Sequence, residues 1–308
     1  MGARFGDPEA QPLLVRMKSD IVPVLQACAR QELTVSELEW HDRASVCVVM
    51  ASGGYPGAFE KGLSVTAQLL QGKKILARRY KAKKFIAYFQ SFSNTYAPLP
   101  VLQSLYAEAL DVDDVVGLFI GTRPDCVDDA VLNLLQDYAR HYLIWIEYGL
   151  QSASDATLAY INRGHDVQCF KDAVEKTRDR GIKICAHVIL GLPHESRQDM
   201  LHTAEMLATL GIDGIKLHLL YVIKGTALET LYRQGDFKCL EQSAYVDIVC
   251  DFLERIPSDV VIQRLTGDPH PAELVAPTWA LNKSETLEKI RQTLEKRDSR
   301  QGRLFKRQ

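Results

Sequence analysis

The feature that most restricts the fold is a strand, a polar turn and a helix in residues 141–166. Residues 143–146 are aliphatic and aromatic, which is typical of a strand buried on both faces. Glu147 follows directly, and a carboxylate at the end of a buried strand is unfavourable unless it meets a donor or a ligand. Ser154 or Asp155 can cap the next helix, and Gly164 is its predicted stop. The stretch predicts a βα unit whose polar groups gather at the C-terminal end of the strand.

Similar units repeat along the chain. Strand-like runs at 85–89, 115–120, 182–190 and 214–220 alternate with helical patterns at 64–79, 98–109, 128–141, 168–180 and 197–210. Alternation at about 30 residues per unit requires parallel strands with right-handed crossovers. No G-x-G-x-x-G follows the first of these strands, which disfavours a dinucleotide-binding fold. The predicted class is α/β, and in barrels of this class the active site lies at the C-terminal ends of the strands.

The two ends of the chain depart from this repeat. Residues 11–30 have helical periodicity, 45–50 read as a strand, and 51–57 form a glycine-rich turn for which a tight loop is favoured over phosphate binding. We expect the 45–50 strand to cover the edge of the 85–89 strand, which would otherwise be open to aggregation. After 220, helices are predicted at 226–234, 241–256 and 284–297, with a candidate sixth barrel strand at 260–265 and a frayed basic tail.

Composition excludes several classes of protein. The 308 residues are 46% hydrophobic and 25% charged with a net charge of −2, which is ordinary for a soluble globular protein and gives no global reason to expect nucleic acid or anionic lipid as a partner. No apolar run reaches the ~18 residues that span a bilayer, and no secretory signal is present, so a cytoplasmic location is expected. The basic cluster at 78–84 is interpreted as a solvated helix end, with an anion or nucleic-acid site as the alternative.

The cysteines follow no cluster motif. No C-x-x-C and no iron–sulfur spacing occurs, so reduced and mostly buried thiols are predicted. The seven cysteines are Cys28, Cys47, Cys126, Cys169, Cys185, Cys239 and Cys250.

Strand alternation sorts the polar side chains into faces. Lys216 and His218 share one face of their strand, and Cys185 and His187 share a face of another, with Lys183 expected to be exposed at the strand start. Polar groups that recur on buried strands favour a site inside the barrel over a satisfied core. The candidate site residues from this reasoning are Glu147, Gln151, His187 and His218.

The first 62 residues resemble part of phosphoribosylamine–glycine ligase, an ATP-grasp enzyme. The resemblance rests on ARFGDPEAQPLL, KSDIVPVLQACA and VCVVMASGGYPGAFEKG. The family places a metal-binding Glu and Asn just before the first motif. Here Gly2 occupies the Asn position and the Glu position precedes Met1. Because the ATP-binding body is also missing, this chain alone is not expected to carry the ligase reaction.

From 63 to 308 the chain looks like a radical S-adenosylmethionine (radical SAM) protein, from an uncharacterised bacterial family related to the catalytic subunit of elongator. The motifs are FQS at 89–91, GTRPDC at 121–126, IEYGLQS at 146–152, INRGHD at 161–166, VILGLPHES at 188–196 and GIKLH at 214–218. The resemblance implies a partial (β/α)6 barrel, here truncated, that holds SAM across its strand ends. We expect a ligase-like segment at 1–62, a barrel core at 63–225 and an extension at 226–308.

The resemblance also implies roles for individual residues. Gln90 and Ser91 stand where the family holds the methionine amine, and Glu147 and Gln151 would lie at the ribose and amine. Arg163 would pair with the methionine carboxylate, which suits a guanidinium fork. Residues 189–193, with Ile189, Gly191 and Pro193, would pack on the adenine. Together with His187 and His218, these residues are the predicted SAM site; RNA or another macromolecule is the target class that the resemblance allows.

One departure from the family affects function. Radical SAM chemistry needs three thiolates, usually C-x3-C-x2-C, to hold a [4Fe–4S] cluster, and the family carries them on the loop after its first strand. Here the ligase-like segment occupies that place, and Cys28 and Cys47 lack the spacing. We expect the cluster ligands to be absent. Without the cluster, we expect this chain not to cleave SAM reductively. The alternatives are a non-catalytic SAM-binding or interaction protein, and a chimeric gene product without selected activity.

Overall fold

A computed structural model describes residues 44–50, 63–90 and 92–306, of which 44–50 are described as backbone. The predicted helix at 11–30 and the glycine-rich turn at 51–57 lie outside these residues. The chain divides into two compact units, Met1–Gly149 with Cys169–Cys185, and Leu150–Gln168 with Ala186–Gln308. The boundaries cross strands β4 (Leu143–Gln151) and β5 (Lys183–Leu190) and helix α7 (Val167–Thr177), so each unit holds part of these elements.

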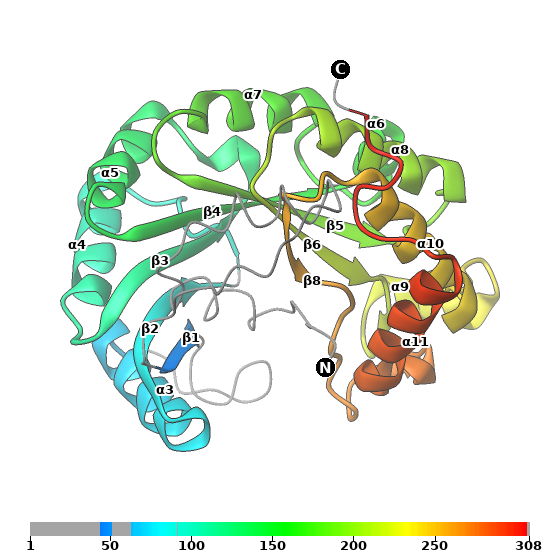
Figure 1. Cartoon of the computed structure of the whole chain (residues 1–308), viewed down its shortest axis with the longest axis horizontal. Coiled ribbons are helices and arrows are strands. Elements are labelled where there is room, and N and C mark those ends of the chain that lie inside the picture. The colour runs from blue at the N-terminus through cyan, green and yellow to red at the C-terminus, as the bar shows by residue number, and fades with distance from the viewer. Residues whose placement is uncertain (1–43, 51–62, 91, 307–308) are drawn as a thin grey trace. The chain divides into compact units, whose positions relative to one another are not determined.

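The first unit is built on parallel strands in sequence order (Figure 1). Helices α3, α4 and α5 lie along the outer side of β2, β3 and β4 in this unit. The strands are β1 (Ala44–Met50), β2 (Ala82–Phe89), β3 (Val115–Thr122) and β4 (Leu143–Gln151), and the helices are α3 (Val65–Tyr80), α4 (Leu99–Leu110), α5 (Asp129–Ala139) and α7 (Val167–Thr177). The short helix η1 (Pro124–Cys126) follows β3.

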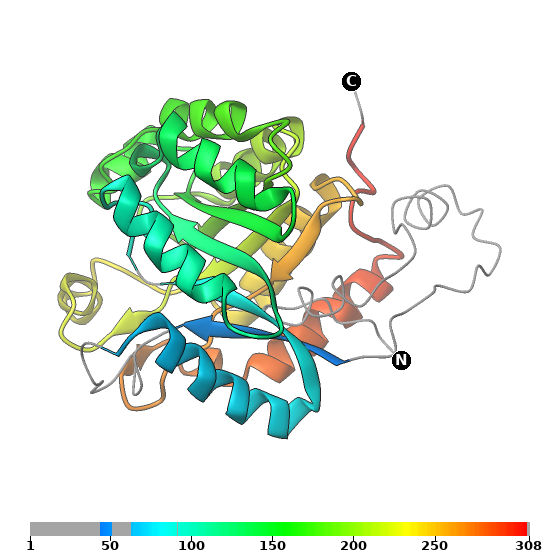
Figure 2. The same ribbon diagram turned by 90° about the vertical axis from the view of Figure 1, so that its left-hand side faces the viewer.

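Strand β1 covers the edge of β2. It pairs in parallel with β2 from Ser45, opposite Lys84, to Met50, opposite Phe89. Helix α3 packs against β1, and the two run side by side in Figure 2. The prediction that the 45–50 strand covers this edge is confirmed. The backbone groups of β2 that would otherwise be an open template for pairing are bonded within the chain.

The second unit continues the βα alternation. Strand β6 (Gly214–Leu219) lies between β5 and β8 (Val261–Arg264), and β6 and β8 pair in parallel, which confirms a further strand near 260–265. A small antiparallel pair, β7 (Val222–Ile223) with β9 (Leu274–Ala276), was not predicted. The helices are α6 (Asp155–Tyr160), α8 (Arg197–Thr209), α9 (Ala227–Gln234), α10 (Gln242–Arg255) and α11 (Lys283–Lys296), with η2 (Thr278–Leu281) before α11.

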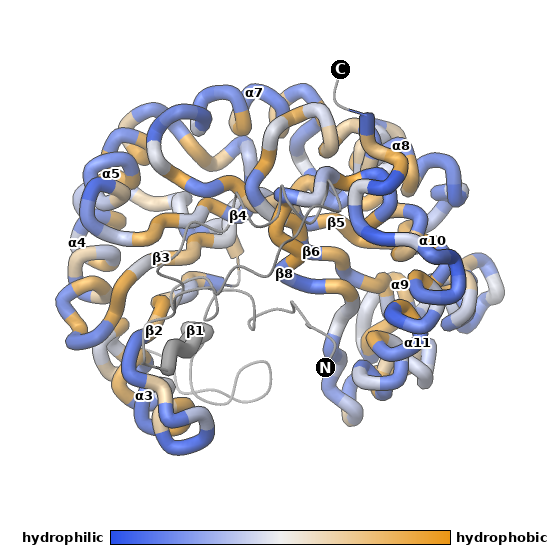
Figure 3. Tube along the Cα trace, in the orientation of Figure 1, coloured by the Kyte–Doolittle hydropathy of each residue, from blue (hydrophilic) through white to orange (hydrophobic). Residues whose placement is uncertain are grey.

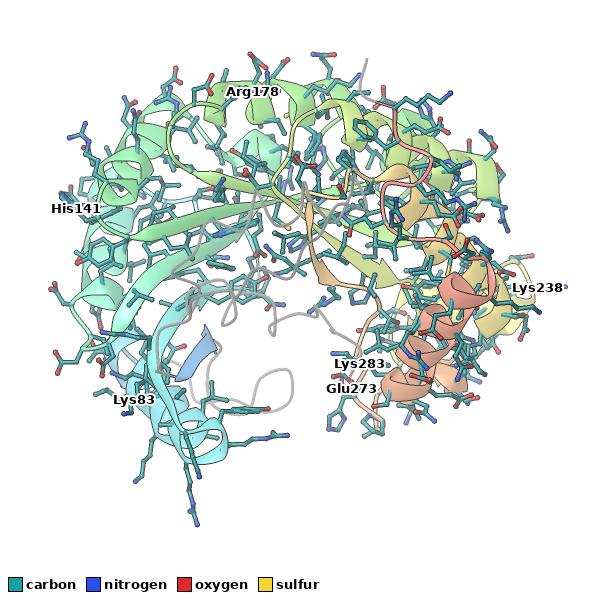
Figure 4. The ribbon with its side chains drawn as sticks, in the orientation of Figure 1. Lys83, His141, Arg178, Lys238, Glu273 and Lys283 are labelled. Carbon is teal, nitrogen blue, oxygen red and sulfur yellow. The ribbon has the colours of Figure 1, made fainter. Side chains whose placement is uncertain are left out.

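Burial follows hydropathy in both units. The strands are the most hydrophobic segments, while hydrophilic stretches run along the helices (Figure 3). Strand β4 is buried from Ile144 to Leu150, as expected for a strand covered on both faces. Polar side chains such as Lys83, His141 and Arg178 point outward at the margin of the first unit (Figure 4).

Several predicted boundaries were wrong. The turn expected at 149–152 is strand as far as Gln151, and α6 ends at Tyr160 rather than near Gly164. Asn162 has a φ of 51°, so the backbone leaves the helical conformation before Gly164. Strand β2 begins at Ala82, so the end of the 78–84 basic cluster lies on a strand and not on a helix end.

The basic tail is also not frayed in the described part. The backbone N–H groups of Gly302 and Leu304 donate to the carbonyls of Leu253 and Glu254, and Gln301 Nε2 donates to Pro257 O and Val260 O. These bonds hold the tail against the end of α10. The prediction failed because composition does not show that a polar segment has backbone partners elsewhere in the fold.

Candidate functional site

A row of aromatic side chains crosses the first unit. The strand register places Tyr88 opposite Phe119 and Phe119 opposite Trp145. The ring centroids of Tyr88 and Phe119 are 6.4 Å apart, and those of Phe119 and Trp145 are 5.5 Å apart. Trp145 is 3% exposed, and its Nε1 has no hydrogen-bond partner among the described residues. The three rings form an aromatic row across β2, β3 and β4, before the C-terminal ends of these strands.

Glu147 lies directly above this row. It is 0% exposed, and Tyr88 Oη donates a hydrogen bond to its Oε2 at 2.6 Å. Its Cα partner on β3 is Gly121, so the hydrogen bond from Tyr88 on β2 spans β3. Cys185 Sγ lies within 4.8 Å of a Glu147 oxygen. The expectation that this carboxylate meets a donor is therefore confirmed, and Tyr88 is the donor that sequence reasoning missed.

The loop after β2 is held by polar bonds to β3. Asn94 Nδ2 donates to Phe89 O at 3.2 Å and to Gly121 O at 2.8 Å, and Thr95 Oγ1 lies 2.6 Å from Thr122 Oγ1. The exposed residue Gln90 begins this loop, while Ser91 lies outside the described residues. Sequence reasoning saw a polar turn here but not these roles of Asn94 and Thr95. The bonds fix where Gln90 emerges from the strand.

In the second unit, predicted SAM residues lie on two segments. Gln151 is half-buried with a φ of 75°, and Arg163 is half-buried in the turn after α6. Ile189 and Gly191 are half-buried at the end of β5, and Pro193 is buried. A Cβ at Gly191, which has a φ of 88°, would lie 3.0 Å from Leu240 Cδ1. Leu240 therefore packs against the backbone at the end of β5, a contact that the sequence did not predict.

The half-buried carboxyl group of Glu195 joins these two segments. Ser152 Oγ donates to Glu195 Oε1, and burial raises the pKa of Glu195, while the hydroxyls of Ser152 and Thr157 oppose the rise. Ser154 caps α6 by accepting from Thr157 N, and Asp155 instead accepts from Val167 N at 2.8 Å. The choice left open by the sequence is therefore settled in favour of Ser154. The bonds fix the turn after β4 against the loop after β5.

Two histidines of the second unit lie on its sheet. His187 on β5 and His218 on β6 are half-buried, and Lys216, two residues before His218, is 1% exposed. Strand register places Lys216 opposite Arg264 on β8. As predicted, Lys183 is exposed at the start of β5. The polar face expected from strand alternation is present on these strands.

The described cysteines do not offer a site for a [4Fe–4S] cluster. Cys185 and Cys250 are buried, and Cys126, Cys169 and Cys239 are half-buried, none in a disulfide. Burial raises the pKa of Cys239 to about 11 and that of Cys250 to about 12, which disfavours the thiolates that iron binds. Among the residues that the structure describes, no three cysteines come together as metal ligands. The donor set of this part does not fit the cluster.

Comparisons with known proteins identify the family. A model of the Radical SAM superfamily matches residues 63–207, and a model of the Radical_SAM C-terminal domain matches residues 212–296. The uncharacterized protein YtqA of Bacillus subtilis (strain 168) is 39% identical over 280 residues, which cover 91% of this chain and 85% of that protein. This chain belongs to the radical SAM superfamily.

A solved structure shows the fold of this radical SAM chain. The archaeal Methanocaldococcus infernus Elp3 matches with a TM-score of 0.69 and 20% identity, over 83% of this chain and 64% of the Elp3 chain. The predicted class, an α/β fold with a partial radical SAM barrel, is confirmed. The phosphoribosylamine–glycine ligase of Rhizobium meliloti (strain 1021) is 52% identical over 64 residues, which are 21% of this chain and 15% of the ligase. The resemblance to a small part of a ligase is thus also confirmed.

The comparisons do not test the individual SAM contacts or the three domain boundaries, which therefore stay predictions. No helix among the described residues has the length and apolarity needed to cross a membrane. Gln151, Ile189, Gly191 and Pro193 lie at strand ends of the second unit, whereas in the first unit Gln90 follows β2 and Glu147 lies in the middle of β4.

Proposed function

We propose that this chain binds SAM at the C-terminal ends of its strands and does not cleave it reductively. The observation that carries the proposal is the distribution of thiols in a chain of this superfamily. A cluster needs three converging thiolates. The five described cysteines lie on separate elements, two of them with pKa values raised by burial, and Cys28 and Cys47 lack cluster spacing.

The SAM-binding part of the proposal rests on polar groups at the strand ends. Glu147 lies in the middle of β4 and Gln151 ends this strand, Ile189 lies near the end of β5 and Gly191 follows it, and Arg163 is half-buried after α6. Arg163 is assigned to the methionine carboxylate, Glu147 and Gln151 to the ribose and amine, and Ile189, Gly191 and Pro193 to the adenine. Gln90, Ser91 and His187 complete the proposed site.

Calorimetric titration with SAM tests the binding half of the proposal. Arg163→Ala should weaken SAM affinity about 10- to 100-fold, because a hydrogen bond to a charged group is worth ~1.5–3 kcal/mol. The matched control is Arg178→Ala, since Arg178 is exposed and pairs with Glu175 on α7. Affinity that is unchanged in Arg163→Ala, or absent in the unaltered chain, would refute SAM binding at this place.

Anaerobic reconstitution with iron and sulfide tests the other half. The treated protein, with SAM and a strong reductant, should form neither the visible band of a stoichiometric [4Fe–4S] cluster nor 5′-deoxyadenosine. A stoichiometric cluster together with 5′-deoxyadenosine would show that the thiols converge after all. The titration and the reconstitution are independent, so either half of the proposal can fail alone.

A further inference from the structure

His218 on β6 is held in one tautomer. Its Nδ1 lies 2.7 Å from the carbonyl oxygen of Leu219, which can only accept, so Nδ1 carries the proton and donates it. In the neutral ring the other nitrogen, Nε2, is then an acceptor. No described residue forms a hydrogen bond with Nε2, and this atom is not among the fully enclosed polar atoms. The ring therefore presents a fixed acceptor with an unused lone pair.

Two neighbours fix the position of this ring. Tyr221 packs beside it with ring centroids 5.1 Å apart. Gly267, in the loop after β8, lies beside the ring edge that carries Nε2: a Cβ there would lie 2.8 Å from His218 Cε1, 3.1 Å from His218 Nε2 and 2.6 Å from Tyr221 Cε1. Real Cβ atoms do not approach so closely, so only glycine allows this packing. The acceptor is thus held by backbone and ring contacts.

The surroundings keep the ring uncharged. Burial, then the positive charge of Arg264, and then His187 lower the pKa of His218 to about 4, against the hydrogen bond to Leu219 O, which raises it. A base this weak removes few protons at neutral pH, so a general-base role is disfavoured. A cationic donor would be repelled by Arg264. A neutral hydroxyl group is therefore the donor best suited to His218 Nε2. An anionic group next to that hydroxyl would suit the guanidinium of Arg264.

We propose that His218 and Arg264 form a subsite for a second ligand that carries a hydroxyl group beside a phosphate or carboxylate. The hydroxyl donates to His218 Nε2, and the anionic group meets the guanidinium of Arg264. Arg264 ends β8 beside β6, so both side chains come from neighbouring strands of one unit. This assignment gives His218 to the second ligand and not to SAM, whose hydroxyls lie on its ribose, apart from its carboxylate, and whose sulfonium and ammonium groups are positive; the subsite does not depend on SAM binding.

Calorimetric titration with four probes tests the subsite. Ribose 5-phosphate and malate combine a hydroxyl with a phosphate or a carboxylate, whereas ribose and inorganic phosphate each lack one of the two. We expect one combined probe to bind about 3- to 10-fold more tightly than inorganic phosphate, which lacks the hydroxyl contact, and about tenfold or more tightly than ribose, which lacks the charged contact. Which of the two binds distinguishes a sugar phosphate from a hydroxy acid.

Variants assign the two contacts. His218→Phe, which lacks an acceptor, should weaken the combined probe about 3- to 10-fold, and His218→Gln, which keeps an acceptor, should weaken it less. Arg264→Gln should weaken it about tenfold or more because a charged contact is lost. The exposed residue His202 on α8 supplies the control, His202→Phe, which should leave affinity unchanged.

A measurement on the unaltered protein guards against variants that fail to fold. In 15N NMR of histidine-labelled chain, Nε2 of His218 should be unprotonated and should shift when ribose 5-phosphate or malate is added. The proposal is overturned if neither probe binds, if His218→Phe and Arg264→Gln bind as the unaltered chain does, or if Nε2 carries the proton. SAM titrated in parallel reports on the proposed function separately.

Discussion

Replacing Tyr88 with Phe removes one hydrogen bond from the centre of the first unit. Tyr88 is 1% exposed and Glu147 0% exposed, and the bond between them is 2.6 Å long. No water replaces the hydroxyl easily at such burial, so the carboxylate loses a donor without compensation. A hydrogen bond to a charged group is worth ~1.5–3 kcal/mol, so we expect Tyr88→Phe to lower the free energy of unfolding by about 2 kcal/mol.

Urea unfolding followed by tryptophan fluorescence measures this loss. The comparison variant is Tyr106→Phe, because Tyr106 is 0% exposed and its hydroxyl donates to the neutral carbonyl of Asn94 at 2.7 Å. A bond between neutral groups is worth about 1 kcal/mol, so Tyr106→Phe should cost roughly half as much. Both substitutions delete one buried hydroxyl, and the charge of the acceptor is what distinguishes them.

A double-mutant cycle separates the bond from other effects of the substitution. In a Glu147→Gln background, Tyr88→Phe should cost about 1 kcal/mol or less, because the acceptor is no longer ionised. The reasoning is refuted if Tyr88→Phe costs no more than Tyr106→Phe, or if its cost is the same in both backgrounds.

Three further predictions concern packing, capping and pH. Gly117→Ala should lower the free energy of unfolding by about 3 kcal/mol or more, because the added Cβ would lie 2.3 Å from Leu143 O. Gly121→Ala is the control and should cost far less, since its Cβ would lie 3.4 Å from Phe89 O. Thermal unfolding compares the two variants. Ser196→Ala should cost about 1 kcal/mol in the same assay, because Ser196 and Asp199 form a capping box at the start of α8. His218 has a pKa of about 4 when folded, below its ordinary value of 6.5, so it contributes stability above pH 6.5 that is lost as the pH falls towards 4. Urea unfolding at pH 7 and pH 4.5 should show a loss that is smaller in His218→Gln; an equal loss in both proteins would contradict the assignment.

Much of the secondary structure could be predicted because it depends on local patterns. The apolar run at 143–146 and the helix patterns around it gave the βα order, and the small polar residues Ser64, Ser154 and Ser196 are the observed N-caps. The ends of elements were predicted less well. Strand β4 continues through Gly149 to Gln151 because neighbouring strands supply its ladder bonds, and such bonds are not encoded by the residues that use them.

The candidate site divides in the same way. The sequence by itself determined that Glu147, His187 and His218 stand on buried strands, because side chains alternate along any strand. Only the tertiary structure decided their partners. Tyr88 on β2 bonds to Glu147 on β4 across the intervening strand β3, and Gly267 packs against His218 from a loop distant in the sequence. These contacts depend on strand register and on which segments meet in space, and a pattern read along one chain contains neither.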